Sequence, residues 1–210
     1  MTKNNQTNNS ADQLRAMHLR ITETSPWIKR FEHLVPKAAR VLDVAAGGGR
    51  HGRRFLELGA SVTFIDRDIS GLSDLLNSEK ARVIEADLET TTTPFDSGGH
   101  LEGENFDAII VVNYLHRPLL GVLIESLSTG GFFLYETFAR GNEKFARPRN
   151  PKHLLESGEL LTTVAGKLQV IAYEHGQLNV ADIPGVKQRL CAVKDQYYST
   201  GGELSTYPFA

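Results

Sequence analysis

The sequence predicts an α/β fold: a doubly wound, seven-stranded, mostly parallel sheet with a C-terminal antiparallel hairpin. Three observations predict it. From Arg40 onward, short β-rich runs alternate with helical patterns, which is typical of parallel strands joined by helices. A glycine-rich turn follows the first of these runs. The last two β-rich runs have no helix between them, so they should pair antiparallel at the sheet edge.

The predicted strands are runs of apolar and β-branched residues bounded by polar residues or glycine. Five of them should be parallel, at residues 41–45, 62–66, 82–86, 108–113 and 132–135. Two more follow, at 168–173 and 188–193, joined by a segment that contains glycine and proline. We expect the last strand to be inserted beside the fifth.

Helix signals fall between these strands. Ser25 can cap the first amides of a helix whose first turn holds Pro26, where a missing N–H costs nothing. Further helices are predicted at 50–58 before a glycine, at 70–76 from a serine, and over the apolar repeat 119–127 before a glycine pair. Asn150 and Pro151 should open a helical stretch towards Val164.

Composition narrows the class of protein. The 210 residues are 40% hydrophobic, which suits one compact domain, and the formal net charge of −2 disfavours binding to nucleic acid or to an anionic membrane. A single cysteine, Cys191, cannot form an internal disulfide, and no stretch approaches the ~18 apolar residues of a membrane helix. We predict a cytoplasmic protein with a disordered lead at 1–11, a single domain at 12–197 and a loose tail at 198–210.

The glycine-rich turn is the most informative block. It reads Val41-Leu-Asp-Val-Ala-Ala-Gly-Gly-Gly-Arg50, between the first strand and a helix. Glycines let the backbone pass close to a ligand, and the helix start offers free amides. A purely structural tight turn is the alternative.

Three aspartates surround this turn. Asp43 lies inside the strand before it, Asp66 closes the second strand 23 positions later, and Asp87 ends the third. A carboxylate at the end of the second strand can accept both hydroxyls of a ribose, and Asp87 can accept an amine hydrogen from an adenine edge. The set suits a ligand with a ribose, an adenine and a cationic end. The alternative is that these aspartates are ordinary caps or turn residues.

At this point the sequence resembles the class I S-adenosylmethionine (SAM) dependent methyltransferases. Their acidic-x-Gly-x-Gly-x-Gly turn corresponds here to Asp43-Val-Ala-Ala-Gly-Gly-Gly49, with Ala45 in place of the usual first glycine. The later signals are Val62-Thr-Phe-Ile-Asp-Arg-Asp68, Glu85-Ala-Asp-Leu88, Phe106-Asp-Ala-Ile-Ile-Val-Val-Asn113 and Leu127-Ser-Thr-Gly-Gly-Phe-Phe-Leu134. More narrowly, Ser25-Pro-Trp27, Gly49-Arg-His51, Tyr114-Leu-His-Arg-Pro118 and Tyr135-Glu-Thr-Phe138 resemble uncharacterised bacterial methyltransferases near the tellurite-resistance type.

The resemblance implies a Rossmann-like methyltransferase fold and roles for the matched residues in binding SAM. The turn would surround the methionine portion, the end of the second strand would hold the ribose, the end of the third would face the adenine, and the end of the fourth would lie beneath the sulfonium. The residues concerned are Asp43, Ala45, Gly47, Gly49, Asp66, Arg67, Asp87, Leu88, Asn113 and Tyr114. The methyl of Ala45 would narrow the methionine end of the pocket.

The acceptor side should be built from residues 114–117 and 136–149, after the fourth and fifth strands, and from the terminal hairpin. His116 follows the fourth strand and could accept a proton from the acceptor, with Tyr114 beside it; a structural role at the helix start is the alternative for His116. Substrate-binding candidates are Arg117, Glu136, Arg140, Arg147 and His175. The cations among them favour an anionic acceptor, whereas a solvated basic loop at 138–149 is the alternative.

Together these observations predict an enzyme that transfers a methyl group from SAM to a small-molecule acceptor by in-line displacement and releases S-adenosylhomocysteine. No metal is expected, and nothing in the pattern assigns an oligomeric state. A nicotinamide-dependent oxidoreductase and a SAM-binding protein without catalysis are the other candidates. Asp43 and the terminal hairpin argue against the first, and RNA as the acceptor is disfavoured by the charge.

Overall fold

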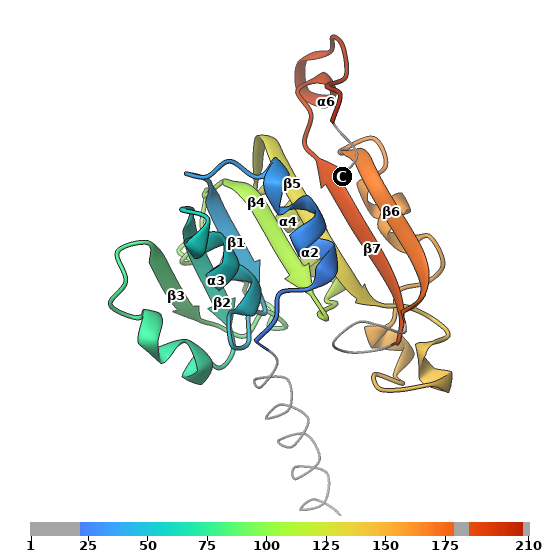
Figure 1. The fold of residues 1–210 in the computed structure, drawn as a ribbon, viewed down its shortest axis with the longest axis horizontal. Helices are drawn as coiled ribbons and strands as arrows, with labels where there is room; N and C mark the ends of the chain where they lie inside the picture. Colours follow the sequence, from blue (N-terminus) through green and yellow to red (C-terminus); the bar gives the residue numbers. More distant parts are fainter. Residues whose placement is uncertain (1–21, 179–184, 208–210) are drawn as a thin grey trace, which may run out of the picture.

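The fold is centred on one seven-stranded sheet (Figure 1). The structure is a computed structural model that describes residues 22–178 and 185–207. The spatial order of the strands is β3-β2-β1-β4-β5-β7-β6. β7 runs in the opposite direction to the other six strands. The bounds are β1 Arg40–Val44, β2 Ser61–Asp66, β3 Ala81–Glu85, β4 Phe106–Val112, β5 Leu127–Phe138, β6 Gln169–Leu178 and β7 Gly185–Val193.

The helices are short and cover both faces of the sheet. They are α2 Pro26–Phe31, η1 Glu32–Leu34, α3 Arg50–Glu57, η2 Ser70–Leu75, α4 Arg117–Glu125, η3 Asn142–Lys144, η4 Pro151–His153, α5 Glu159–Val164 and α6 Tyr197–Thr200. None of those in the described ranges has the length and apolar character that a bilayer crossing requires.

Alternation along the strands separates two apolar cores. In β1, Val41 belongs to the core under α2 and α3, whereas Leu42 belongs to the core under α4 and α5. Trp27 and Phe55 are two of the large side chains of the first core, and both are 1% exposed. Asp43 shares the face of Val41 and therefore lies under α3.

The predicted fold class is confirmed, including the antiparallel pair and the insertion of the last strand beside the fifth. Ser25 caps α2 as expected: its hydroxyl accepts the N–H of Trp27 at 3.2 Å, with Pro26 in the first turn. The segment predicted as a helix from Ser70 is a 3-10 helix.

The single helix predicted from Pro151 to Val164 is wrong. The segment holds η4 and α5, separated by extended backbone around Leu155. Leu155 donates its N–H to the carbonyl of Phe138 at 2.9 Å and accepts the N–H of Arg140 at 2.9 Å. Because these backbone groups bond to the end of β5, they are not available to a continuous helix.

The tail predicted to be loose contacts the sheet as far as residue 207. The ring of Tyr207 packs edge-on against Phe132 at 5.7 Å between centroids, and the N–H of Ser205 donates to Asp195. The lead predicted at 1–11 lies outside the described residues, as do residues 208–210.

Candidate active site

The turn between β1 and α3 has a backbone that few side chains tolerate. Ala45, Gly47 and Gly49 all have positive φ, of 52°, 56° and 74°. A Cβ added at Gly47 would meet nothing within 4 Å, so the turn leaves space beside it. Ala45 stands at the position where the resemblance expects glycine, and its left-handed conformation costs about 1–2 kcal/mol for a residue with a Cβ.

Asp66 joins the end of β2 to this turn. Its Oδ2 accepts the N–H of Gly47 at 2.7 Å, and its Oδ1 accepts the N–H of Asp68 at 3.0 Å. Each carboxylate oxygen has two lone pairs, so each can still accept a hydroxyl. The side chain predicted for the ribose is thus held at the edge of the glycine turn.

Asp43 is buried beneath the turn. It is 1% exposed, and its Oδ2 accepts the N–H of Gly52 in α3 at 2.8 Å. Burial raises the pKa of this carboxyl to about 7, against the lowering effects of the Gly52 hydrogen bond and the Arg50 charge, while Asp66 adds to the rise. A cationic ligand near the turn would favour its ionised form.

The end of β3 supplies the other predicted cofactor residues. Asp87 accepts the N–H of Glu89 at 2.9 Å, and Leu88 is buried at 4% exposure in the core under α4. Tyr114 lies near them: burial is the main cause that raises its pKa, with Glu89, Asp87 and Asp66 adding to the rise and Arg67 opposing it.

Tyr114, predicted as a catalytic residue beneath the sulfonium, follows β4. The charges that act on its phenol come from the ends of β2 and β3. Its hydroxyl is buried and has no hydrogen-bond partner among the described residues.

Asn113 follows β4 and faces the turn from the neighbouring strand. Its φ of 59° is left-handed, and its N–H donates to the carbonyl of Glu136 at 2.8 Å. Its Oδ1 is buried without a partner among the described residues. An unpaired buried acceptor at the carboxyl end of β4, the strand next to β1, fits a ligand that donates hydrogen bonds.

His116 is the residue at which α4 begins. It is half-buried, has an extended backbone, and makes no side-chain capping hydrogen bond. The imidazole of His116 therefore does not cap α4, contrary to the alternative considered for it.

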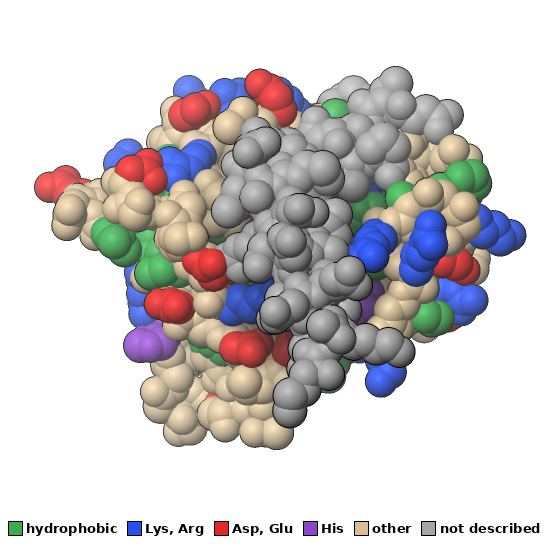
Figure 2. All heavy atoms as spheres, turned by 90° about the horizontal axis from the view of Figure 1, so that it is seen from below, with side chains coloured by type: hydrophobic (Ala, Val, Ile, Leu, Met, Phe, Trp, Pro, Cys, Tyr) green, Lys and Arg blue, Asp and Glu red, His purple; other side chains and the backbone are tan. Residues whose placement is uncertain are grey.

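The face formed by the carboxyl ends of the parallel strands is divided in charge. Figure 2 looks onto this face: basic side chains gather at the right, over the segment between β5 and β6, and acidic ones toward the lower left and centre, over the ends of β2 and β3.

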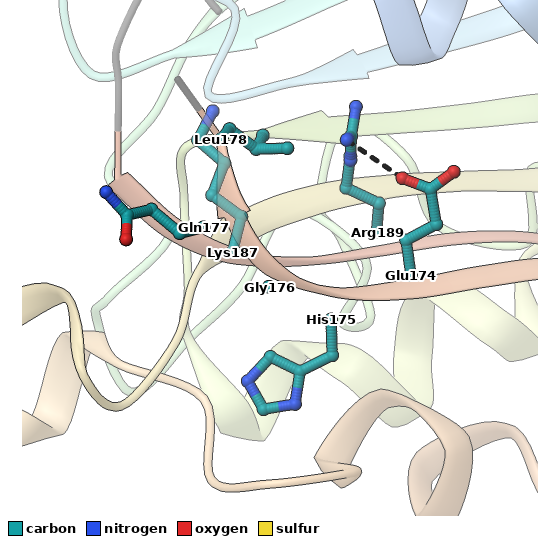
Figure 3. A pocket seen from close by; sticks show the side chains of 7 residues that line it. All are labelled: Glu174, His175, Gly176, Gln177, Leu178, Lys187 and Arg189. Carbon is teal, nitrogen blue, oxygen red and sulfur yellow. Dashed lines mark ion pairs between the residues drawn. The ribbon is translucent and has the colours of Figure 1, made fainter. Parts of the chain in front are cut away.

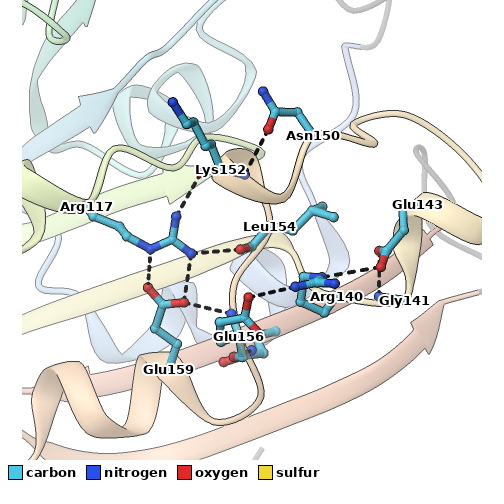
Figure 4. Close-up of polar contacts among 10 residues, drawn as sticks. Arg117, Arg140, Gly141, Glu143, Asn150, Lys152, Leu154, Glu156 and Glu159 are labelled. Carbon is cyan, nitrogen blue, oxygen red and sulfur yellow. Dashed lines mark hydrogen bonds and ion pairs between the residues drawn. The ribbon is translucent and has the colours of Figure 1, made fainter.

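Two arginines predicted to bind substrate hold the loop between β5 and α5 together (Figure 4). Arg117 forms two hydrogen bonds to Glu159, at 2.6 and 2.9 Å, and two to the carbonyls of Lys152 and Leu154, both at 2.8 Å. Arg140 pairs with Glu143 at 3.3 Å and with Glu156 at 2.9 Å. Their charges are therefore compensated by glutamates that the sequence analysis did not pair with them.

Two further acceptor-side candidates, Arg147 and His175, have exposed side chains. Arg147 is exposed on the same loop. His175 is exposed in β6, and Figure 3 shows its side chain on the opposite side of the hairpin from Lys187, Arg189 and Glu174.

Glu136 forms the most buried ionic contact of the described residues, and the sequence analysis missed its partner. Its Oε1 accepts from Nζ of Lys187 at 2.5 Å, with side-chain exposures of 3% and 2%, and its Oε2 accepts the hydroxyl of Ser25 at 2.8 Å. Lys187 falls between the connection predicted at 176–185 and the strand predicted from Gln188, so the sequence analysis assigned it to neither. Because Lys187 is followed by two further polar residues, Gln188 and Arg189, the local pattern gives no signal for an inward-facing lysine.

His51, in the first turn of α3, is a buried residue to which the sequence analysis assigned no role in the site. It is 4% exposed in α3, and its Nδ1 has no partner among the described residues. Burial lowers its pKa to about 3, helped by the charges of Arg50 and Lys187. The imidazole is therefore neutral, and the charge of Lys187 acts on it.

Solved structures with the same fold are methyltransferases. TehB from Haemophilus influenzae has a TM-score of 0.62 and 17% identity, over 80% of this chain and 61% of its own, so this chain spans about three fifths of its length. A TehB-like SAM-dependent methyltransferase from Corynebacterium glutamicum has a TM-score of 0.57 and 17% identity, over 90% and 98% of the two chains.

A third structure was solved with ligands bound. The 1,6-didemethyltoxoflavin-N1-methyltransferase from Burkholderia thailandensis, with bound 1,6-didemethyltoxoflavin and S-adenosylhomocysteine, has a TM-score of 0.56 and 20% identity, over 84% of this chain and 78% of its own. No protein-family model and no curated protein matches the chain in sequence. The likeness establishes that this chain has the class I methyltransferase fold.

Proposed function

We propose that the chain is a SAM-dependent methyltransferase that acts on a small molecule. The observation that carries the proposal is the arrangement around Asp66: its carboxylate bonds to the turn at Gly47, and that turn has open space on one side and the unpaired Oδ1 of Asn113 nearby in the next strand. These are the residue types and positions that a nucleoside with a cationic amino-acid end requires.

Each part of the site would hold one part of the cofactor. Asp66 would accept the ribose hydroxyls, Asp87 and Leu88 would meet the adenine, and Tyr114 would form a wall beside them. The backbone of the turn from Ala45 to Gly49 would contact the methionine portion, with Asp43 beneath it. When bound, SAM supplies an electrophilic methyl group on its sulfonium.

The protein's own contribution to the reaction is positioning. An acceptor held about 3–3.5 Å from the reacting atom can gain on the order of 7–11 kcal/mol from placement alone. We propose that the imidazole of His116 removes a proton from the acceptor, because it lies three residues after Asn113, immediately before α4, and does not cap the helix. General-base help of this kind contributes about 10²–10⁴-fold.

Calorimetric binding of S-adenosylhomocysteine tests the cofactor site. Replacing Asp66 with Ala removes the charged acceptor for the ribose and should weaken binding by about 1.5–3 kcal/mol, roughly tenfold to a hundredfold. Asp107→Ala is the matched control: Asp107 also accepts a backbone N–H, from Arg40 at 2.8 Å, but it lies at the amino end of β4. Equal affinities for the two variants would refute the assignment.

Turnover tests the reaction itself. Release of S-adenosylhomocysteine from SAM is measured against thiols, amines, carboxylates and oxyanions, and at least one class should support it. His116→Gln should then lower kcat by about 10²-fold or more while the affinity for S-adenosylhomocysteine stays unchanged. A variant with the wild-type kcat would remove His116 from the mechanism, and binding without turnover of any acceptor would favour a non-catalytic SAM-binding protein.

A further inference from the structure

A hollow of about 350 Å³ lies where the β6–β7 hairpin meets the carboxyl edge of the sheet. Both strands line it, with residues 174–178 of β6 and with Lys187 and Arg189 of β7. Figure 3 shows the side chains of Lys187, Arg189 and Glu174 on the same side of the hairpin. That is the side of α2, because the Arg189 guanidinium lies 5.2 Å from the centre of the Trp27 ring.

The floor of the hollow is joined to the proposed methyl-transfer site. Lys187 lines the hollow and is bonded to Glu136 in β5. The carbonyl of Glu136 accepts the N–H of Asn113, and the Lys187 charge acts on His51 in the first turn of α3. A molecule in the hollow would therefore lie two contacts away from the residues around the glycine turn.

The ion pair at this floor contributes little to stability. Taking two charges out of water costs several kcal/mol per ion, and their mutual attraction rarely repays more than that cost. An ammonium has three N–H donors, and among the described residues Glu136 takes one of those of Lys187. The remaining donors can serve a ligand.

Cations outnumber anions around the hollow. Lys187, Arg189 and Arg30 stand against Glu136 and Glu174: Arg189 pairs with Glu174 at 2.8 Å, and Arg30 pairs with the same glutamate at 3.0 Å. One carboxylate thus serves two guanidinium groups. A further anion would balance this excess, and hydrogen bonds between charged groups are stronger than those between neutral ones.

Apolar surface lies next to these cations. Leu178 lines the hollow, and the ring of Phe138 lies 5.1 Å from Nζ of Lys187. A volume near 350 Å³ is at the lower end of the range for small-molecule sites, which run from about 300 Å³ upward. The lining therefore suits a compact molecule with one anionic group beside an apolar body.

We propose that this hollow binds the methyl acceptor through a carboxylate held by Lys187 and Arg189. The inference rests on the proposed methyl transfer and names the acceptor class: a small carboxylic acid with an apolar portion. It also moves anion recognition from the loop of Arg140 and Arg147 to β7, since Arg140 is already paired with two glutamates.

Titration followed by amide NMR of the full chain tests the inference. The probes are benzoate, phenylacetate and hexanoate, each compared with its neutral amide, with and without saturating S-adenosylhomocysteine. At least one carboxylate should shift the amide signals of Gly176, Lys187 and Arg189, and should bind at least tenfold more tightly than its amide.

Two variants separate recognition from folding. Arg189→Gln removes an outer cation, and the double variant Lys187→Met with Glu136→Gln removes the buried pair without leaving a lone charge. Each should weaken carboxylate binding about tenfold or more and leave the affinity for S-adenosylhomocysteine within twofold of the wild type. The matched control, Arg82→Gln, removes an arginine that pairs with Glu104 at 2.6 Å near the opposite edge of the sheet, and should change neither.

The outcomes distinguish the two proposals. If S-adenosylhomocysteine fails to bind, the proposed methyl transfer falls. The carboxylate site is overturned if S-adenosylhomocysteine binds but none of the three carboxylates shifts the backbone signals of Gly176, Lys187 and Arg189. It is also overturned if the neutral amide analogues bind as tightly as the acids. The same holds if both variants keep the carboxylate affinity of the wild type.

Discussion

Asp43 and His51 should give opposite pH dependences to the stability of the folded chain. Both are buried within the same part of the structure, one under α3 and one in its first turn. Burial raises the pKa of Asp43 from 3.8 to about 7 and lowers the pKa of His51 from 6.5 to about 3. In each case the folded state favours the neutral form.

The sign of each effect follows from which state binds more protons. Between pH 3.8 and about 7, folded Asp43 holds a proton that unfolded Asp43 has released, so the unfolding free energy rises as the pH falls. Between pH 6.5 and about 3, unfolded His51 takes up a proton that folded His51 does not, so the unfolding free energy falls as the pH falls.

Each slope is about 1.4 kcal/mol per pH unit, and each complete window amounts to roughly 4 kcal/mol. The windows overlap from pH 3.8 to 6.5. In the wild type the two contributions should therefore nearly cancel there. Asp43→Asn leaves the histidine effect alone, and His51→Gln leaves the aspartate effect alone.

Urea unfolding at pH values from 4.5 to 7.5, followed by the fluorescence of Trp27, the single tryptophan, measures this. Relative to the wild type, the unfolding free energy of Asp43→Asn should fall by about 1.4 kcal/mol per unit of acidification below pH 6.5, and that of His51→Gln should rise by a similar amount. Taking differences from the wild type removes the contribution of all other titrating groups. The reasoning is refuted if both differences are independent of pH, or if both have the same sign.

Three further predictions concern the turn and its neighbours, each measured as a change in the free energy of unfolding. Gly52→Ala should destabilise by about 1–3 kcal/mol, because the new Cβ would lie 2.2 Å from Cε1 of Phe64; an unchanged stability would contradict this packing. Ala45→Gly should stabilise by about 1 kcal/mol by relieving the left-handed backbone, and a loss of stability would show that the methyl is needed. Arg117→Met should cost about 1–3 kcal/mol through the lost bonds to Glu159 and two carbonyls, and should leave acceptor KM unchanged; a raised KM would return Arg117 to the substrate site.

The sheet could be predicted from sequence because its signals are local. Apolar runs with β-branched residues mark buried parallel strands, and the missing crossover before the last strand fixes its antiparallel direction. The broken helix at 151–164 could not be predicted in this way. Its interruption depends on backbone bonds between Leu155 and the end of β5, which are far away in sequence.

The same distinction between local signals and tertiary contacts applies to the residues of the candidate site. Asp43, Asp66 and Asp87 could be proposed from sequence because each lies in or directly after a strand next to a glycine turn. The glutamate partners of Arg117 and Arg140 could not, since tertiary contacts bring them together. Charge density along the sequence thus gives no measure of which cations remain available to a ligand.

The reversed strand explains how the proposed acceptor site differs in character from the cofactor site. In a parallel sheet only the residues at the end of a strand reach the carboxyl edge. In β1 to β3 these positions hold or adjoin aspartates: Asp43 near the end of β1, Asp66 at the end of β2 and Asp87 just after β3. Because β7 runs antiparallel to β5, its first residues reach that same edge: Lys187 lies opposite Phe138 and opposite Gly176 of β6. The beginning of β7 and the end of β6 then line a single hollow. Insertion of β7 therefore brings inward-facing cations to an edge whose other half is acidic, and this separates a site suited to a cationic cofactor from one suited to an anionic acceptor.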